Sequence, residues 1–269
     1  MKRIFAVLLA LSLLLLAACS KGVSPTEPSH TEPATQAPTE PATDAPTEPS
    51  QTEPATEPSQ PTEEEGPFTV TYAHAQADTH GSGEVWVQLL AEITNTCAEP
   101  LTLGAADWTV CTPDGTELAV RKGVSAYPQT IEPGEKGWYY DEFTVDTAQT
   151  GELAVQYDGD ALAASIRAVE QSGVRYAVSD VNLKDSVYGG VELTGRIRND
   201  TAEQGSLVCV AAVLLDESEK PLGVVYTVLG SPLEAGTETT FGMSSEMLPP
   251  EVKSADIAQV ETFAYPLAE

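Results

Sequence analysis

The stretch LLAEITNTCAEP, residues 89–100, has a near copy about a hundred residues later in LTGRIRNDTAEQ, residues 193–204. A shift of 104 residues places Val70–Glu99 on Val174–Glu203 without a gap, and ten of the thirty aligned positions are identical. One unit of structure is therefore expected to occur twice in this chain.

Both copies alternate apolar residues with mostly polar ones, from Val87 to Ile93 and from Val191 to Ile197. A period of two is the pattern of an antiparallel strand with one buried face. Each strand then stops at an asparagine, Asn95 or Asn199. Asparagine suits a turn because its side chain bonds to nearby backbone and it tolerates left-handed dihedral angles. The repeated stretch therefore predicts a core strand and the turn that ends it.

Further strands are expected on both sides of this pair, separated by turns about every ten residues, with no convincing helix of ordinary length. This spacing predicts an all-β chain with two β-sandwiches, residues 67–168 and 169–269. The segment Asp160–Gln171 fits a helical stripe, but the preceding Asp158-Gly159 also suits a hairpin turn, and both alternatives stand. The strands that support the duplication open at Val70 and Val174, continue at Trp108–Thr112 and Val208–Leu215, and carry Tyr139 and Phe241 at equivalent later places.

The second copy contains four short motifs with a common family likeness. They are V-x-L-x-G-x-I-x-N-x-T at Val191–Thr201, Leu214–Asp216, Leu222-Gly223, and LEAGTETTF at Leu233–Phe241. Together they resemble the FxLYD-type immunoglobulin-like domain found in exported proteins of Gram-positive bacteria. The resemblance covers most of the second half and, more loosely, the first. It implies two tandem immunoglobulin-like sandwiches and brings no catalytic residues with it.

The N-terminus has the pattern of a targeting segment. Lys2 and Arg3 precede an apolar run, Ile4–Leu16, which is short for a membrane span and has the length of a signal-peptide core. The run ends in Leu16–Cys19, which resembles the lipobox of bacterial lipoproteins. The resemblance implies a signal peptide over residues 1–18, a lipid on Cys19, and export to the outer face of the cytoplasmic membrane. An ordinary secretory signal with an incidental cysteine is the alternative.

Residues 19–66 are expected to form a disordered spacer. From Ser24 to Gly66 the sequence varies the triplet Thr-Glu-Pro, with ten acidic residues, no Lys or Arg, and no Val, Ile, Leu or aromatic residue. Such a segment has too little apolar surface to offset the entropy of ordering. Its prolines favour polyproline II at about 3.1 Å per residue, so it would reach on the order of 100 Å from the membrane. Recognition by readers of Pro-rich motifs and glycosylation of its threonines are alternatives.

The remaining chemistry argues for binding rather than catalysis. The formal net charge of −28 disfavours nucleic acid as a partner because phosphates would be repelled. No nucleophile-elbow, paired-cysteine or zinc-protease motif occurs, and His74 and His80 are poorly spaced for a shared metal. We expect no enzyme, no cofactor and no metal. A disulfide between Cys97 and Cys111 stays open, because Thr201 replaces Cys97 in the second copy.

The two copies differ in one predicted surface. If the apolar residues around Trp86 and Trp138 face inward, then Trp86, Trp138 and Tyr140 face outward, and the second copy has no aromatic residue at these places. Outward aromatics can form a platform for a sugar ring or a protein. The alternative is that they pack under a loop or against the other domain.

The sequence thus predicts a lipid-anchored surface protein whose two non-enzymatic modules bind a protein or glycan of the cell envelope. The membrane contact would be made through Cys19 only. An accessory subunit that braces an envelope enzyme or transporter is the alternative. A hydrolase would require carboxylates clustered in a deep cleft.

Overall fold

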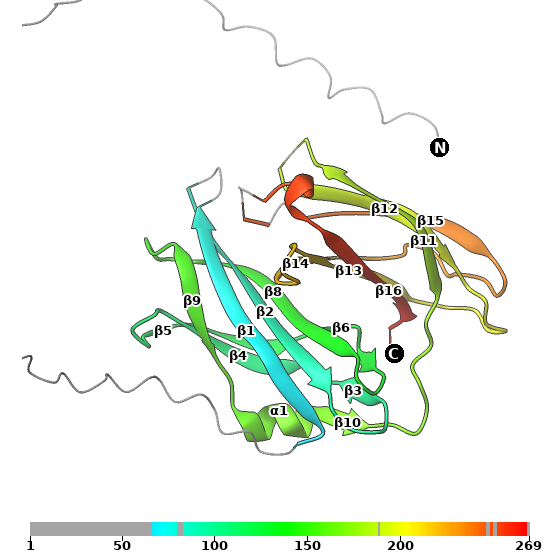
Figure 1. The fold of residues 1–269 in the computed structure, drawn as a ribbon, viewed down its shortest axis with the longest axis horizontal. Coiled ribbons are helices and arrows are strands. Elements are labelled where there is room, and N and C mark those ends of the chain that lie inside the picture. Colours follow the sequence, from blue (N-terminus) through cyan, green and yellow to red (C-terminus); the bar gives the residue numbers. More distant parts are fainter. Residues whose placement is uncertain (1–65, 80–82, 188, 246–247, 250–251, 268–269) are drawn as a thin grey trace, which may run out of the picture. The chain divides into compact units, whose positions relative to one another are not determined.

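The computed structural model describes residues 66–79, 83–187, 189–245, 248–249 and 252–267. Within these ranges the chain is mostly β-strand, arranged in four antiparallel sheets, with one short α-helix and one 3-10 turn. The prediction of an all-β chain is confirmed (Figure 1). The expected signal peptide, Cys19 and the Thr-Glu-Pro spacer up to residue 65 lie outside the described residues, as does His80.

The first half contains a seven-stranded sheet in the order β5-β4-β9-β1-β2-β8-β6 and a small sheet in the order β10-β3-β7. Its elements are β1 (Phe68–Thr79), β2 (Val85–Asn95), β3 (Leu101–Leu103), β4 (Ala106–Cys111), β5 (Glu117–Val124), β6 (Ala126–Tyr127), β7 (Thr130–Ile131), β8 (Lys136–Val145), β9 (Gly151–Gln156), α1 (Gly159–Ser165) and β10 (Ile166–Ala168).

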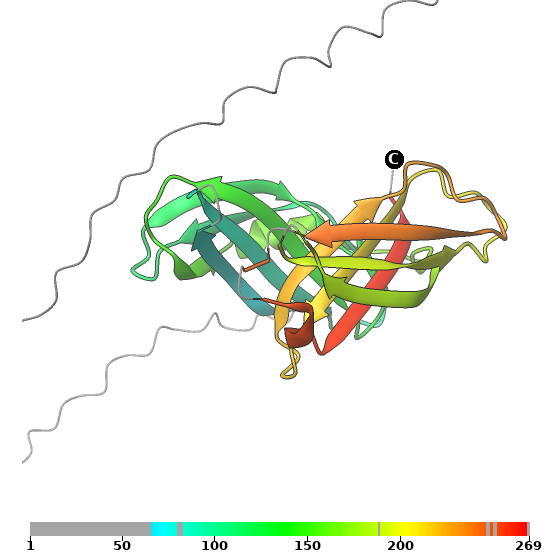
Figure 2. The ribbon, with the colours of Figure 1, turned by 90° about the horizontal axis from the view of Figure 1, so that it is seen from above.

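The second half contains two three-stranded sheets, in the orders β11-β12-β15 and β14-β13-β16. Figure 2 shows these strands in yellow-green to red, with β15 in orange and β16 in red on different sheets. The elements are β11 (Ala177–Asp185), β12 (Val191–Arg198), β13 (Val208–Leu215), β14 (Pro221–Val228), β15 (Glu238–Ser245), η1 (Ser254–Asp256) and β16 (Gln259–Pro266).

The two halves share one strand plan. The triplet β1-β2-β8 corresponds to β11-β12-β15, and β5-β4-β9 corresponds to β14-β13-β16. Tyr139 pairs with Ala91 in the first half as Phe241 pairs with Gly195 in the second, so the predicted equivalence of these aromatics is confirmed. The main difference is that β1 also pairs with β9, which joins the two triplets of the first half into one sheet. The duplication read from the sequence is therefore a duplication of strand order.

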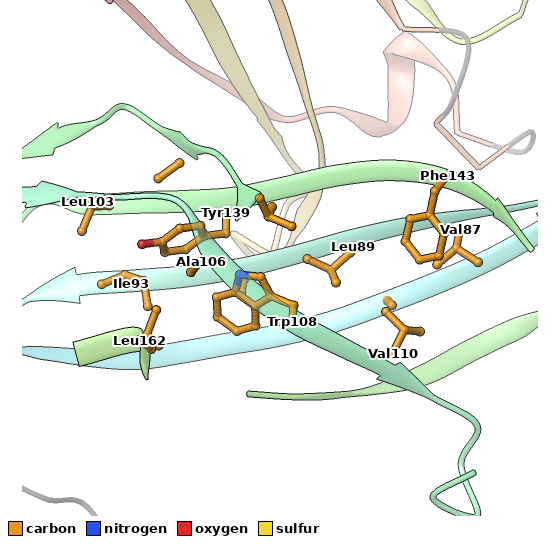
Figure 3. Close-up of a cluster of buried hydrophobic side chains, with 14 of the residues drawn as sticks. Val87, Leu89, Ile93, Leu103, Ala106, Trp108, Val110, Tyr139, Phe143 and Leu162 are labelled. Atoms are coloured by element: carbon orange, nitrogen blue, oxygen red, sulfur yellow. The ribbon is translucent and has the colours of Figure 1, made fainter. Parts of the chain in front are cut away.

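Each half has its own hydrophobic core between its two triplets. The first core takes the inward side chains of β2, which are Val85, Val87, Leu89, Ala91 and Ile93, as their alternation predicts. Trp108 and Tyr139 fill the middle of this core, with ring centroids 5.3 Å apart. Figure 3 shows both rings beside Leu89 and Ile93. The second core is built in the same way from β12, β13, β15 and their neighbours.

The repeated asparagine is a buried anchor in both halves. Asn95 is 1% exposed and Asn199 is fully buried. The Asn95 amide donates to the carbonyl oxygens of Glu99 and Ile131, at 2.9 and 3.2 Å. The Asn199 amide donates to the equivalent carbonyls of Glu203 and Leu233, at 2.8 and 3.0 Å. Since buried carbonyls need donors, one side chain holds together two loops that lie far apart in the sequence.

The loop held by each asparagine turns through a glycine with positive φ, 79° at Gly134 and 70° at Gly236. The amide of each glycine donates to the backbone oxygen of the asparagine, Gly134 to Asn95 and Gly236 to Asn199. Glycine adopts this left-handed backbone without a steric penalty, so the sequence pair Pro-Gly or Ala-Gly is suited to the turn.

The ambiguous segment after β9 forms a short helix, not a hairpin. Asp158 caps α1, with its carboxylate accepting from the amides of Asp160 and Ala161 at 3.0 and 3.1 Å. An N-terminal aspartate satisfies amides that have no partner within the helix. The helix ends at Ser165, and Ile166 already belongs to β10, so of the expected helical stripe only Leu162 is a buried helix residue.

Candidate functional site: a tyrosine pocket beside the junction of the two halves

The outer face of β1-β2-β8-β6 in the first half carries Leu90, Trp138 and Tyr140. Leu90 lies opposite Tyr140, and Trp138 lies between Glu92 of β2 and Tyr127 of β6. Period-two alternation on β8 thus directs Trp138 and Tyr140 away from the first core, as predicted. The two aromatic side chains point out of their own half.

These side chains are nevertheless buried. Trp138 is 1% and Tyr140 5% exposed, because they pack with Leu90 against Val213, Leu215 and Val224 of the second half. The ring centroids of Trp138 and Phe263 lie 5.7 Å apart. Both halves belong to one compact unit. The expectation that Trp138 and Tyr140 form an exposed platform is wrong, and the alternative of packing against the other half is the one observed.

The reason lies on β13, whose sequence VCVAAVLL is buried at every position. A strand covered on one face only should alternate, whereas a continuous apolar run indicates a strand covered on both faces. Val208, Val210, Ala212 and Leu214 enter the second core. The intervening residues face the first half or its margin, and this run was the sequence signal for the junction.

A chain of side-chain hydrogen bonds lies at the edge of this junction. Gln88 donates through Nε2 to the Tyr140 hydroxyl at 3.0 Å, and that hydroxyl donates to the carboxylate of Glu142. Burial raises the pKa of Tyr140 well above its ordinary value, and the neighbouring Glu142 charge raises it further. Burial also raises the pKa of Glu142, although the Tyr140 hydrogen bond acts in the opposite direction. The outer face of β8 therefore combines packing with one satisfied buried hydroxyl.

The segment between the halves is fastened to the loop that Asn95 holds. Arg175 donates to the carbonyl oxygen of Thr130 and forms an ion pair with Glu135 at 3.4 Å. Its guanidinium also lies 5.4 Å from the centroid of the Phe263 ring, within range of a cation–π contact. Arg175 thus contacts both halves beside the junction.

The outer face of the β14-β13-β16 sheet packs on the first half at this junction. Beside the junction, the same face continues into a cavity of about 260 Å³. Tyr127 of β6 and Tyr226 of β14 form one wall, with stacked rings 4.8 Å apart at an angle of 28°. The rim is apolar and open, since Leu207, Tyr226 and Val228 are 43%, 48% and 41% exposed. The other lining residues are Ser125, Ala126, Gln129, Cys209, Tyr265 and Leu267. We call this cavity the tyrosine pocket.

Tyr265 gives the tyrosine pocket a buried polar group. The side chain is 4% exposed, and its hydroxyl has no hydrogen-bond partner of full strength. Cys209 lies beside Tyr265 across the β13–β16 pairing, but a thiol is only a weak donor and acceptor. Burial raises the pKa of Tyr265, and the adjacent Cys209 raises it further. Burial also raises the pKa of Tyr127, next to Tyr226. These hydroxyls therefore stay protonated and neutral.

The other residues that the sequence singled out, apart from Cys209, do not line the tyrosine pocket. Trp86 lies on the outer face of β2 and is only partly buried. The Nδ1 atom of His74 lies 3.1 Å from Oε1 of Glu152, and burial lowers the pKa of His74, which favours the neutral imidazole. Cys97, Cys111 and Cys209 are free, so the structure contains no bond between Cys97 and Cys111.

Metal-binding clusters and membrane-spanning helices are both absent from the described residues. Among them, no group of three His, Cys, Asp or Glu side chains is arranged to hold a metal ion. No helix within the described ranges has both the length and the apolar character needed to cross a bilayer.

Neither a protein-family model nor a curated protein matches this chain. Among solved structures, it is similar to a calcium-binding mutant of β-glucuronidase 2 from Bacteroides uniformis, at 14% identity and a TM-score of 0.22, over 71% of this chain and 26% of that one. It is also similar to a β-glucuronidase of glycoside hydrolase family 2, at 10% identity and a TM-score of 0.21, over 67% of this chain and 24% of the other. The chain spans about a quarter of the length of each. TM-scores this low are too small to infer a shared fold or activity.

Sequence reasoning missed Tyr127, Tyr226 and Tyr265, because each is a single tyrosine in an ordinary strand pattern. The apolar run of β13 was the available signal in the sequence, because it implied that the outer face of this strand is covered. The neighbouring strands β14 and β16 belong to the same face. The corresponding strand β4 is shorter and less uniformly apolar, and its own outer face is left to Asp107 and Thr109.

Proposed function

We propose that this protein is an exported lipoprotein that binds a ligand at the bacterial cell surface without chemical conversion of that ligand. In this proposal residues 1–18 are the signal peptide, Cys19 carries the lipid, and residues 20–66 are the spacer. The two halves are two tandem immunoglobulin-like β-sandwiches. Their shared strand plan, their separate cores and the equivalent asparagine anchors support this interpretation.

The observation that carries the binding role is the tyrosine pocket with its exposed apolar rim. Leu207, Tyr226 and Val228 gather around one concave site, and clustered exposed apolar side chains mark places of interaction. The residues that line it include no carboxylate, histidine or lysine. A tyrosine whose pKa is raised by burial is a poor general base near neutral pH. The lining therefore favours binding over acid–base catalysis.

Photo-cross-linking in cells tests the binding role. A photoreactive amino acid at position 226 should give a discrete cross-linked product on irradiation, because Tyr226 stands at the rim. The matched control is position 181 on β11, where Val181 is also exposed but belongs to the other sheet of the second half. Equal labelling from both positions, or none from position 226, would count against a binding site here.

Fractionation tests the anchor separately. Cys19→Ala should move the protein from the membrane fraction to the soluble fraction, since a lipidated cysteine would be its only membrane attachment. The control is Cys97→Ala, which removes a cysteine from a β-turn and should leave the protein in the membrane fraction. Retention of the Cys19→Ala protein on membranes would contradict the lipoprotein assignment.

A further inference from the structure

We propose that the tyrosine pocket takes one neutral pyranose ring of a saccharide. This inference rests on the proposed binding function, because it names the ligand class of the same pocket. Four features of the pocket support it: its size, its lack of charge, its aromatic wall and its unsatisfied hydroxyl.

The size of the pocket selects a small ligand or a single ring of a larger one. Its volume of about 260 Å³ lies just below the roughly 300–1,000 Å³ of sites that hold drug-sized molecules. The rim at Leu207, Tyr226 and Val228 is open to solvent, so a ring bound there can belong to a longer chain. A terminal or internal sugar of an oligosaccharide meets both conditions.

The electrostatics select a neutral ligand. None of the lining side chains carries a charge, and the formal net charge of the whole chain is −28. Arg175, which lies about 6.0 Å from the centroid of the Tyr265 ring, is already paired with Glu135. An acidic ligand would meet repulsion without a free cation to compensate for it, and a basic ligand would lose hydration without a carboxylate partner inside the pocket.

The Tyr127–Tyr226 pair supplies a surface for the apolar face of a sugar. The C–H bonds on one face of a pyranose carry a small positive charge, and the face of an aromatic ring carries a negative one. Tyr226 is about half exposed, so its ring offers area without further opening of the core. Because Tyr226 is held by stacking at 4.8 Å against Tyr127, little side-chain entropy remains to be lost on binding.

The polar groups distinguish a sugar from an apolar side chain of a protein partner. Tyr265 has a hydroxyl without a full-strength partner, and Gln129 and Ser125 add an amide and a hydroxyl to the lining. An apolar occupant would leave the Tyr265 hydroxyl unpaired, which is unfavourable. The Tyr265 hydroxyl has almost no exposed area in the unliganded pocket, so a pyranose reaches it through a small displacement of the side chains that cover it. Sugar hydroxyls both donate and accept, and one of them then satisfies the Tyr265 hydroxyl.

The test is a titration of the lipid-anchored protein with saccharide probes, in a detergent that has no sugar headgroup. Calorimetry and saturation-transfer NMR monitor the binding. The probes are maltotriose, cellotriose and triacetylchitotriose, all of them neutral. Trigalacturonate serves as the charged comparison and N-acetyl-phenylalaninamide as the apolar comparison. For one ring with few hydrogen bonds, a Kd on the order of 1 mM is expected for at least one neutral trisaccharide. Trigalacturonate should bind at least tenfold more weakly.

Four variants locate the site. Tyr226→Ala should weaken binding about tenfold or more, because it removes the exposed aromatic wall. Tyr265→Phe should weaken it about three- to tenfold, because it removes one hydrogen bond and keeps the ring. The matched controls are Trp86→Ala and Tyr157→Phe, which change an aromatic and a tyrosine in the first half away from the pocket and should leave Kd unchanged. Thermal unfolding of each variant checks that it folds.

Each outcome decides the inference. Binding of a neutral trisaccharide that depends on Tyr226 and Tyr265 supports it. Saccharide binding that ignores both variants overturns it, because the sugar then binds elsewhere. If only the blocked phenylalanine binds, and does so through Tyr226, the saccharide inference fails while the binding function stands with a protein partner. If no probe binds and position 226 gives no cross-link in cells, both fail.

Discussion

The two halves of this protein are nearly interchangeable at one place and opposite in character at another. At the asparagine turns, Asn95 and Asn199 make the same hydrogen bonds to equivalent backbone groups. On the outer faces, Trp138 and Tyr140 of β8 in the first half pack against Val213 and Val224 of β13 and β14 in the second, which are strands of the other triplet and not the equivalents of β8. The shared turn preserves the fold of each half, and the unlike faces fit one against the other.

This contrast locates where function can differ between copies. A buried side chain that satisfies two carbonyls is costly to change, so both copies keep it. An outer face is free to change, and here one face has become aromatic and the other continuously apolar. The tyrosine pocket lies at the margin of these faces and draws Tyr127 from one half and Tyr226 from the other. Neither half alone contains the complete site.

The strongest test of the unlike faces is Trp138→Ala. We expect a loss of about 3–5 kcal/mol in the free energy of unfolding, because a fully buried indole leaves a cavity between the halves. The control is Trp86→Ala on the same outer face, where the side chain is only partly buried and the expected loss is under about 1.5 kcal/mol. Urea denaturation followed by far-ultraviolet circular dichroism measures both. Equal losses would show that the junction does not exclude water around Trp138.

The likeness of the two turns is tested by Asn199→Ala and Asn95→Ala. Each variant leaves two backbone carbonyls without their donor, so each should lose about 2–4 kcal/mol of unfolding free energy. The measurement is urea unfolding by tryptophan fluorescence, which reports on the second half as well because Trp138 contacts Phe263. Asn182→Ala, at an exposed position of β11, is the control and should stay within about 0.5 kcal/mol of the parent. A marked difference between the two turn variants would contradict the equivalence of the halves.

Much of each half could be predicted from the repeat, because local rules decide it. Alternation placed Val87 to Ile93 and Val191 to Ile197 on core faces, and the equivalence of Tyr139 and Phe241 followed from the same register. The asparagine was assigned to a turn correctly, but its burial and its bonds to Ile131 and Leu233 were not foreseen. Those partners lie more than thirty residues away, and local pattern does not report them.

The candidate site was out of reach for a related reason. Alternation says which residues point out of one half, but it does not say what covers them. Trp138 and Tyr140 were assigned to the right face and to the wrong environment, because the covering residues come from β13 and β14. Tyr127, Tyr226 and Tyr265 come from three strands and meet only when the halves pack. Single tyrosines carry no spacing signal of that kind.

A smaller effect is expected from the pH dependence of the aromatic face. Burial raises the pKa of Glu142 in the folded protein, so the folded state binds this proton more tightly than the unfolded state. The resulting stabilisation is present below the ordinary glutamate pKa and is lost as pH rises through the folded value. Glu142→Gln should therefore match the parent in acid and become the more stable protein towards neutral pH, with the Tyr140 hydrogen bond retained. Unfolding free energies between about pH 3 and 7 give this difference, with Glu117→Gln at an exposed site as control. A constant offset at all pH values would contradict it.

The smallest expected effect concerns one position at which the two turns differ, Cys97 in the first and Thr201 in the second. The Cys97 thiol contacts Asn95 Oδ1 and the Glu99 oxygen, both at 3.1 Å. The Thr201 hydroxyl donates to the equivalent Asn199 Oδ1 at 2.6 Å and lies 3.0 Å from the Glu203 oxygen. Because a hydroxyl is the stronger donor, Cys97→Thr should raise the free energy of unfolding by up to about 1 kcal/mol, and Thr201→Cys should lower it by a similar amount. Urea denaturation measures both changes. Shifts of the same sign in both swaps would mean that the turns are less alike than their hydrogen bonds indicate.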